Sequence, residues 1–529
     1  MIENRLPQYV QPEPLAITAG AKALDAEAGE SWGLDSFALV EAAGRACAQV
    51  FLNIDLPGDL FFRCRKIAVL AGSGNNAADA LVMLRALILG KKTVAENCCV
   101  YMAKPENADN PKTPLSQAVL ALQKIGVAVK AWENAKAAFA QSAGVLENRL
   151  TVIDGIAGTG LRGALHGAAL EMAEAANSAD ATVVSIDMPS GAFDNWKPGM
   201  PMVRADFTIA VEPHKTCLYF AAQRQNAGTI LAATGIFPQA LMLKHMEAEL
   251  VSWESATCRI KSVQPATHKY GRGVVQIMAG SPGFTGAARL CAMAAQAAGA
   301  GIVRLLADQE ICPILAGSCN GIMVAAENAP EAKSRFTPDA LLLGPGWGRG
   351  EDRKQMLESC LALEAEGTPL VLDADAIALS AGKTFCGNAI LTPHLGEFSN
   401  LVGGGTEEIA AAPLSLLRRF AAEKKATVIL KSHVMYVACH DGRTAVIDGM
   451  NPALAAGGSG DVLAGLCAGI AARSRAGGSF DPYDCACAAV ALLVEAGLAE
   501  NLKDSFADPG KLAEAAGAIA GRAWIRRPQ

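Results

Sequence analysis

Hydrophobic residues along this chain form short apolar runs that alternate with longer stretches whose apolar positions recur at helical spacing. From residue 66 onward the alternation predicts buried strands and amphipathic helices, as in a mostly parallel sheet covered on both faces. The first series predicts strands over 66–72, 94–103, 150–155, 181–187 and 205–212, and helices over 77–89, 114–126 and 165–177. Ahead of this series, an amphipathic helix is predicted over 35–52. The pattern predicts an α/β fold.

A second series of the same kind follows residue 260. It predicts strands over 273–280, 301–307, 339–346, 368–375, 388–394 and 426–431. Between the two series, residues 235–267 have weaker periodicity, and a chain of 529 residues is too long for one ordinary core. We therefore expect two three-layer α/β/α domains, 1–244 and 245–529, which share an architecture but no sequence repeat.

Composition excludes several classes of partner. The net charge of -6 gives no basic field that would hold nucleic acid or an anionic membrane. No apolar run approaches the ~20 residues needed to cross a bilayer, and the amino terminus has no apolar core typical of a secretion signal. The 15 cysteines fit no zinc spacing and indicate reduced, buried thiols. We expect a soluble, cytoplasmic protein.

The segment 451–465 reads NPALAAGGSGDVLAG and places three glycines around Ser459 just before Asp461. Glycines allow close approach of the backbone to an anion, and the helix that follows offers free amides and the positive end of its dipole. A carboxylate beside bound phosphate is best explained as a base that acts on a hydroxyl. The alternative is an ordinary glycine-rich turn with Asp461 as helix cap.

Polar residues also follow four other predicted strands of the second half. They are GPGWG at 344–348, DAD at 373–375, TPHLGE at 392–397 and Lys431. Ligands of open α/β sheets bind beyond the carboxyl ends of the strands, so these residues are expected to lie together. Taken singly, each has an ordinary alternative as a turn, a helix cap or a solvated lysine.

These segments, with THKYGRG at 267–273 and AGSPGFTGAA at 279–288, resemble the ribokinase-like superfamily and, within it, the dehydratase domain of bifunctional NAD(P)H-hydrate repair enzymes. The resemblance implies a ribokinase-like fold, ADP or ATP as co-substrate, and the S form of hydrated NADH or NADPH as substrate. Mg²⁺ is expected from the phosphoryl chemistry, although the spacing identifies no ligand for it. The resemblance also implies that Asp461 is the catalytic carboxylate and contacts the substrate together with Ala287, Gly348 and His394. The nucleotide-binding residues it implies are Lys431, Ser432, His433, Val434, Met435 and Gly460. Where this chain has 432–435, the family usually has Gly-Ala-Gly-Thr.

In the first half, GSGNNAADA at 72–80 follows the first predicted strand and enters a helix, so its amides could meet a pyrophosphate. Asp154 with the loop 158–162, and Asp187 with the loop up to Gly191, follow two further strands. Oxygen donors from three loops are expected to converge, although the two asparagines could also form only a turn and a cap.

These loops resemble the amino-terminal epimerase domain of the same bifunctional enzymes over about residues 15–235. The resemblance implies a Rossmann-like epimerase fold, a K⁺ ion held by Asn76, Asp154 and Ser190, and Asp187 as a catalytic residue that touches the substrate. The residues it implies for dinucleotide binding are Asn75, Asn76, Ala77, Ala78, Asp79, Gly158, Thr159, Gly160, Leu161, Arg162, Gly163 and Ala164. The family prefers Asn-Asn-Gly-Gly-Asp-Gly where this chain reads Asn-Asn-Ala-Ala-Asp-Ala.

Together the two halves predict an enzyme that interconverts the R and S forms of hydrated NAD(P)H and dehydrates the S form at the expense of ADP or ATP. The expected partners are hydrated NADH, hydrated NADPH and ADP, and a homo-oligomer is expected. Two alternatives stay open. One is a ribokinase-like kinase of a small vitamin-precursor alcohol, and the other is a dehydratase whose first domain only binds nucleotide.

Overall fold

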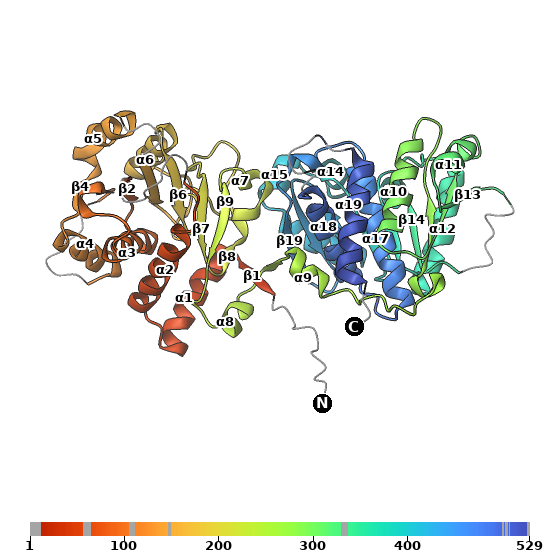
Figure 1. The fold of residues 1–529 in the computed structure, drawn as a ribbon, viewed down its shortest axis with the longest axis horizontal. Coiled ribbons are helices and arrows are strands. Elements are labelled where there is room, and N and C mark those ends of the chain that lie inside the picture. The colour runs from red at the N-terminus through yellow and green to blue at the C-terminus, as the bar shows by residue number, and fades with distance from the viewer. Residues whose placement is uncertain are drawn as a thin grey trace. The chain divides into compact units, whose positions relative to one another are not determined.

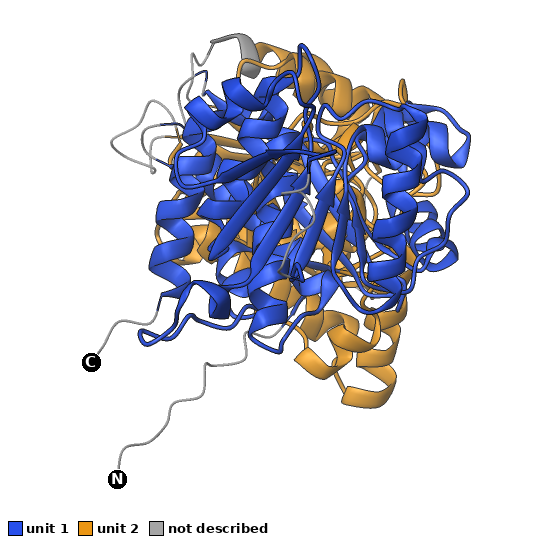
Figure 2. Ribbon diagram, turned by 90° about the vertical axis from the view of Figure 1, so that its right-hand side faces the viewer, with its two compact units in different colours: residues 1–13, 249–529 blue, residues 14–248 orange. Residues whose placement is uncertain are grey.

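The computed structural model describes residues 12–56, 65–104, 112–145, 150–329, 337–499, 502, 506 and 508–525. Its internal contacts divide the chain into two compact units, which Figure 2 shows in different colours. We refer to Pro14–Ala248 as the amino-terminal unit and to Glu249–Gln529 as the carboxyl-terminal unit. Each unit has its own sheet and helices (Figure 1).

The amino-terminal unit is built on a parallel sheet with the strand order β4-β3-β2-β5-β6-β7-β9. The strands are β2 (Lys66–Ala71), β3 (Cys98–Met102), β4 (Ala128–Ala131), β5 (Leu150–Gly155), β6 (Thr182–Ile186), β7 (Phe207–Val211) and β9 (Thr229–Ala233). From β2 the chain first adds strands on one side, β3 and then β4, and afterwards adds β5 and the later strands on the other side. The strand order therefore reverses between β2 and β5, although all strands are parallel. In a doubly wound sheet this reversal opens a crevice at the carboxyl ends of the two strands.

Helices cover both faces of this sheet. They are α1 (Thr18–Trp32), α2 (Ser36–Phe51), α3 (Asn75–Leu89), α4 (Pro114–Lys124), α5 (Trp132–Val145), α6 (Gly167–Ser178), α7 (Ala221–Arg224) and α8 (Gln239–Lys244), with 3-10 turns η2 (Ala95–Asn97) and η3 (Thr216–Tyr219). A short strand β1 (Glu13–Ala16) pairs in parallel with β8 (His214–Lys215).

Alternation along β2 explains the layers. Ile67 and Val69 pack in the core formed with α2, α3 and α4, whereas Ala68 and Leu70 pack in the core formed with α5 and α6. The α/β/α arrangement expected from the apolar runs is therefore present. The helix predicted over 77–89 begins earlier, at Asn75, because Gly74 is its N-cap. The strand predicted over 94–103 is shorter, because residues 95–97 form a 3-10 turn.

The carboxyl-terminal unit contains a larger sheet, with the order β13-β12-β11-β14-β15-β16-β17-β18-β19-β10 within this unit. The strands are β10 (Ala248–Leu250), β11 (Val274–Met278), β12 (Ile302–Ala307), β13 (Met323–Ala326), β14 (Ala340–Leu343), β15 (Leu370–Leu372), β16 (Ala389–Leu391), β17 (Thr427–Leu430), β18 (Val434–Ala438) and β19 (Thr444–Asp448). Pairing is parallel from β13 to β17, but β18 is antiparallel to both neighbours. The apolar pattern of the sequence does not predict this antiparallel meander.

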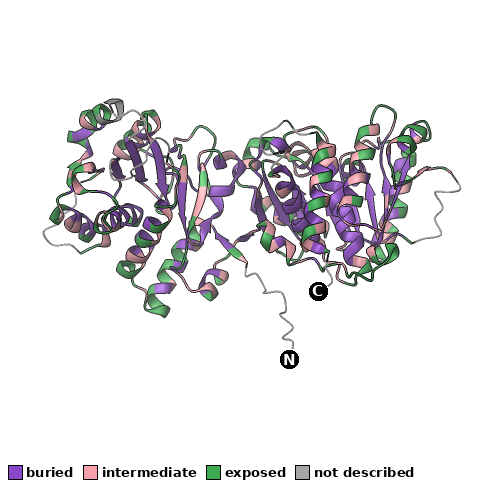
Figure 3. Cartoon of the chain, viewed as in Figure 1, coloured by how far each residue is buried: buried purple, intermediate pink, exposed green. Residues whose placement is uncertain are grey.

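The helices of this unit are α9 (Trp253–Thr257), α10 (Thr285–Ala297), α11 (Cys312–Ser318), α12 (Glu351–Ala365), α13 (Asp375–Leu379), α14 (Leu395–Val402), α15 (Thr406–Ala411), α16 (Pro413–Lys424), α17 (Ser459–Ala476), α18 (Pro482–Gly497) and α19 (Pro509–Trp524), with 3-10 turns η4 (Lys269–Arg272) and η6 (Pro452–Leu454). Helices α17 and α18 are almost wholly buried (Figure 3). Glycine allows α17 to approach α10 closely, because a Cβ atom on Gly465 would lie 2.2 Å from the carbonyl oxygen of Cys291.

No helix in the described part of the chain combines the length and the hydropathy that crossing a membrane requires.

Candidate active sites

The polar loops of the carboxyl-terminal unit follow neighbouring strands. Strands β11, β14, β15, β16 and β17 are hydrogen-bonded in that order and run in parallel, so the segments that follow them emerge at one edge of the sheet. Those segments contain Ala287, Gly348, Asp373, His394 and Lys431. The structure therefore brings together residues that are up to 144 positions apart in the sequence, from 287 to 431.

An ion pair lies at the centre of this edge. Lys431 Nζ lies 2.7 Å from Asp373 Oδ1, and the same oxygen accepts a hydrogen bond of 2.6 Å from the hydroxyl of Thr392. Although burial opposes the charge on Lys431, the neighbouring Asp373 raises the pKa of its ammonium group above the ordinary value. Lys431 is therefore a permanent cation at physiological pH.

Asp461 lies in the first turn of α17, and this helix begins directly after Gly458, whose φ of 102° is left-handed. Burial, reinforced by the charge of Asp373 and opposed by that of Lys431, raises the pKa of Asp461 to about 6. A carboxyl group with this pKa is ionised at neutral pH and still binds a proton readily, as a general base requires. The side chain is half-buried, and its charge interacts with the ion pair.

Gly460 precedes Asp461 in the chain and lies close to Lys431. A Cβ atom on Gly460 would lie 3.3 Å from Lys431 Nζ, so the ammonium group lies against the backbone at the start of α17. The sequence pattern indicated an anion pocket formed by helix amides, and the structure adds a cation beside them.

Next to this point is a cavity of about 230 Å³. Its wall includes Lys431, Ser432, His433, Met435 and Gly460. Val434, the remaining member of the predicted nucleotide-binding segment, is fully buried in β18 and is not part of the wall. The Ser432 hydroxyl closes the turn between β17 and β18, donating to the Val434 carbonyl and accepting from the Val434 amide. A serine thus stabilises a turn in which the family usually has glycine.

The other loops of this edge are held by their own contacts. The amide of Gly348 donates to Asp375 Oδ2 at 2.8 Å, and Arg349 binds the other oxygen of that carboxylate at 2.7 Å. Ala287 lies below the same loop, because a Cβ atom on Gly346 would lie 3.2 Å from its methyl group. The loop after β14 therefore has one defined conformation beside the start of α10.

His394 is exposed and caps helix α14. Its Nδ1 accepts hydrogen bonds from the amides of Gly396 and Glu397, while Glu397 accepts from the amide of His394. Because Nδ1 serves as an acceptor, the Nε2 atom carries the proton of the neutral ring. His394 can therefore offer a donor to a ligand in front of the sheet edge.

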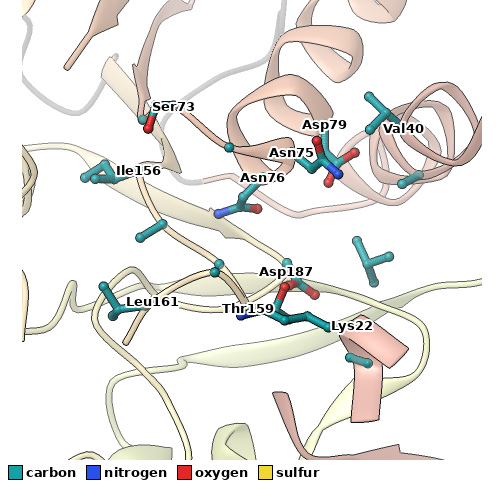
Figure 4. A pocket seen from close by; sticks show the side chains of 18 of the residues that line it. Lys22, Val40, Ser73, Asn75, Asn76, Asp79, Ile156, Thr159, Leu161 and Asp187 are labelled. Carbon is teal, nitrogen blue, oxygen red and sulfur yellow. The ribbon is translucent and has the colours of Figure 1, made fainter. Parts of the chain in front are cut away.

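The amino-terminal unit contains a larger cavity of about 820 Å³ at its topological switch point. Figure 4 shows Asn75, Asn76 and Asp79 from α3 on one side of it and Thr159, Leu161 and Asp187 on the other. The predicted site residues that line it are Asn75, Asn76, Asp79, Gly158, Thr159, Gly160, Leu161 and Asp187.

Seven predicted residues do not line this cavity: Ala77, Ala78, Asp154, Arg162, Gly163, Ala164 and Ser190. The side chains of Ala77 and Ala78 are fully buried in the core, and both of their amides donate to the Gly74 carbonyl in the first turn of α3. The methyl groups that replace family glycines therefore point into the core.

Asp187 forms a buried ion pair in the cavity wall. Lys215 Nζ lies 2.5 Å from Asp187 Oδ1 and also donates to the Val211 carbonyl. The backbone of Asp187 has a φ of 67°, a left-handed value that a non-glycine residue rarely adopts. Such a conformation at a strand end aims the carboxylate into the cavity.

The carboxyl groups of Asp25 and Asp79 also interact with the ammonium group of Lys215. Burial raises the pKa of Asp25 to about 6, with Lys215 opposing and Asp187 reinforcing the shift. Burial, and then the charge of Asp187, raises the pKa of Asp79 well above its ordinary value. Three carboxyl groups around one cation cannot all be ionised at low cost, so the cluster retains at least one proton near neutral pH.

Of the predicted K⁺ residues, Asn76 lines this cavity, whereas Asp154 and Ser190 do not. Asp154 is fully buried, accepts hydrogen bonds from Ser185 Oγ and from both the hydroxyl and the amide of Ser190, and has a pKa raised by burial. Both side-chain polar atoms of Asn76 are buried without a hydrogen-bond partner in the described part of the chain. An amide oxygen, a carboxylate and a hydroxyl are the kinds of oxygen ligand that a hard cation prefers.

Sequence reasoning missed Lys215 and Asp25. Lys215 lies three residues beyond the strand predicted over 205–212, and its position after a strand end could have indicated it. Asp25 is on α1, ahead of the sheet, and no motif marks it.

Two α/β units, each with polar loops around a cavity at its strand ends, define a nucleotide-binding enzyme with two sites. A family model described as NAD(P)H-hydrate dehydratase matches residues 275–517, and a model described as YjeF-related protein N-terminus matches residues 36–217.

Curated relatives match both units together. The chain is 31% identical to the bifunctional NAD(P)H-hydrate repair enzyme Nnr of Salinibacter ruber, over 87% of this chain and 88% of that protein. It is 29% identical to the Nnr enzyme of Escherichia coli, over 92% of this chain and 89% of that protein. Among solved structures, the ADP/ATP-dependent NAD(P)H-hydrate dehydratase of Bacillus subtilis, co-crystallised with ATP and Mg²⁺, is 24% identical over 53% of this chain and 99% of its own, with a TM-score of 0.46. The chain belongs to the family of bifunctional NAD(P)H-hydrate repair enzymes.

Proposed function

We propose that residues 1–244 interconvert the R and S forms of hydrated NADH and NADPH, and that residues 245–529 dehydrate the S form at the expense of ADP or ATP. The observation that carries the dehydratase half is the arrangement of Asp461 beside Gly460 and the Lys431–Asp373 ion pair. It combines a base, free helix amides and a cation in one place.

In the dehydratase site, Asp461 takes the proton of the substrate hydroxyl as the hydroxyl oxygen attacks the terminal phosphoryl group of the nucleotide. The bond to the rest of the nucleotide breaks, so that AMP leaves from ADP, or ADP leaves from ATP. Lys431 and the first amides of α17 stabilise the charge on the transferred group. Loss of the phosphate, together with a proton from the neighbouring ring carbon, then restores the double bond of NAD(P)H. Phosphorylation makes the poor leaving group a good one.

Nucleotide binding is assigned to the cavity lined by Lys431, Ser432, His433, Met435 and Gly460. The hydrated dinucleotide is assigned to the neighbouring loops of Ala287, Gly348 and His394. The described residues contain no group of three or more His, Cys, Asp or Glu side chains that could hold a metal ion, so Mg²⁺ is expected to enter with the nucleotide phosphates. Bound there, it would neutralise phosphate charge.

In the epimerase site, the bond between the ring nitrogen and the hydroxyl-bearing carbon opens and recloses. Asp187 carries the hydroxyl proton to the ring nitrogen during opening and back during closing. The ion pair with Lys215 keeps the Asp187 carboxylate oriented until it accepts that proton. Asn76, Asp154 and Ser190 would hold K⁺, which would offset pyrophosphate charge in a cavity that contains few cations. The pyrophosphate is assigned to the start of α3, where Gly74 provides no side-chain cap.

Recovery of NADH tests the two activities separately. Purified protein is incubated with the S form of hydrated NADH, Mg²⁺ and either ADP or ATP, and NADH is followed by its absorbance. Lack of NADH formation with both nucleotides would contradict the dehydratase assignment. The R form is then supplied, and its consumption is compared with the spontaneous rate of conversion. A rate no faster than the spontaneous one would leave the first unit as a binding domain.

A further inference from the structure

Lys104 lies where the second strand of the amino-terminal sheet ends. Strands β2 and β3 pair in register, with Ala71 opposite Met102, and the amide of Ala103 donates to the Ala71 carbonyl at 2.9 Å. The chain therefore leaves β3 at Lys104 directly beside the loop that starts at Gly72. Lys104 lines the same cavity as Ser73 and Gly74 from that loop.

The sheet order assigns a role to this position. Counted from β2, the strands lie in the order 3-2-1-4-5-6, with β9 as a seventh strand at the edge, which is the order of dinucleotide-binding α/β sheets. In such sheets the pyrophosphate lies at the amino end of the helix after the first strand, here α3. The residue at the end of the second strand meets the adenosine ribose, where a carboxylate binds a 2′-hydroxyl and a cation accommodates a 2′-phosphate.

The charges around the cavity favour a cation that accommodates a 2′-phosphate. The carboxyl groups of Asp25, Asp79 and Asp187 interact with one another and with Lys215. Glu212, which also lines the cavity, accepts hydrogen bonds from the amides of Ile236 and Phe237. Lys104 is exposed, and it has neither an ion-pair nor a hydrogen-bond partner among the described residues. Its ammonium group is available to a ligand.

We propose that Lys104 binds the 2′-phosphate of the adenosine ribose, so that the epimerase site prefers hydrated NADPH to hydrated NADH. The proposal rests on the epimerase function proposed above and adds a choice between its two substrates. Lysine binds phosphate as a point charge. Lys104 follows β3 and Asp187 follows β6, so the two residues lie on opposite sides of the switch point between β2 and β5.

Binding of two probes tests the proposal without any turnover. Adenosine 2′,5′-bisphosphate and adenosine 5′-monophosphate are titrated calorimetrically into the full-length protein and into Lys104→Ala. The substitution is expected to weaken binding of the bisphosphate by about tenfold and to leave binding of the monophosphate unchanged. Equal loss for both probes, or loss for neither, would overturn the proposal.

Kinetics give a second readout. In Lys104→Ala, kcat/KM for epimerisation of hydrated NADPH should fall by about tenfold while the value for hydrated NADH stays constant. Lys92→Ala, which removes an exposed lysine outside the cavity, serves as the matched control and should change neither value. If Lys22→Ala, from the α1 side of the cavity, causes the selective loss instead, the assignment to Lys104 is wrong. Absence of epimerase activity on both substrates would contradict the proposed function, whereas the probe titrations would still decide the role of Lys104.

Discussion

Lys431 and Asp373 form an ion pair of 2.7 Å at the carboxyl edge of the second sheet, and the same ammonium group lies against the backbone of Gly460. The lysine therefore has two neighbours: a carboxylate that holds it in place, and the turn at Gly460 that we propose to bind phosphate. Removing one partner of a buried ion pair typically costs about 3–5 kcal/mol, because the other charge is left uncompensated. Changes at this pair should therefore affect both stability and activity.

Asp461→Asn should abolish dehydration and preserve the fold. An amide cannot accept the hydroxyl proton, so kcat should fall by about two to four orders of magnitude. NADH recovery from the S form measures the loss, and calorimetric titration with ADP measures whether nucleotide binding remains. Glu366→Gln, at an exposed position after α12, is the control. Turnover retained in Asp461→Asn would reject its role as base.

The dehydratase should lose activity below pH about 6 as Asp461 becomes protonated. Since the charge of Lys431 lowers the pKa of Asp461, Lys431→Met should shift the acid limb of the kcat/KM profile to higher pH. Circular dichroism across the same pH range checks that the variant remains folded. An acid limb at the same pH in both proteins would show that another group controls the profile.

Lys215→Met and Asp187→Asn should each remove epimerase activity, because each breaks the ion pair. In Lys215→Met the Asp187 carboxylate loses the group that orients it, and in Asp187→Asn the proposed proton carrier loses its charge. Dehydration of the S form by the same preparation is an internal control, since it depends on the other unit. Lys215→Arg keeps the charge and should retain part of the activity. Unchanged consumption of the R form in Lys215→Met would contradict a role for this pair.

Asp79→Asn should raise the thermal stability of the amino-terminal unit, and more so at pH 8 than at pH 5. The pKa of Asp79 is raised in the folded state, so its contribution to stability is present below the unfolded pKa of 3.8 and is lost as pH rises toward the folded value. Asparagine resembles the protonated acid and has no proton to lose. Calorimetry at both pH values measures the difference. A larger gain at the lower pH would contradict the direction of the shift.

Gly344→Ala should destabilise the carboxyl-terminal unit by about 3 kcal/mol, because the backbone must move. A Cβ atom at this position would lie 1.8 Å from the Asp373 carbonyl oxygen, and the φ of 120° is left-handed. Gly382→Ala is the matched control, with a φ of 83° and no atom within 4 Å of the new methyl group, and should cost only about 1 kcal/mol of strain. Similar melting temperatures for the two variants would show that the contact is relieved without cost.

The residues that the sequence could indicate are those at the ends of parallel strands. Asp373, His394 and Lys431 follow three apolar runs, and the geometry of a parallel sheet brings such ends to one edge whatever the details of the loops. The family resemblance, shown by the relatives that match both units, supplied the chemistry for that edge. Their individual roles stay predictions.

Other parts depend on contacts that no local pattern records. Val434 and Met435 belong to a buried antiparallel strand, because a single turn after β17 reverses the chain, and a short apolar run does not reveal its direction. Asp25 acquires its raised pKa only because α1 brings it to the charges of Lys215 and Asp187. Strand β4 has only four residues, and a Lys interrupts its apolar positions, so its signal was too weak to separate from a loop.

The alanines at 77 and 78 suggest a use beyond this protein. They lie inside α3 with their methyl groups packed in the core, at places where related chains prefer glycine. A chain with alanine there has fewer disordered conformations to lose on folding, which is worth about 0.4–1 kcal/mol for each replacement. Grafting Asn-Asn-Ala-Ala-Asp-Ala into a relative is thus a route to heat tolerance that leaves the cavity-facing Asn76 and Asp79 unchanged.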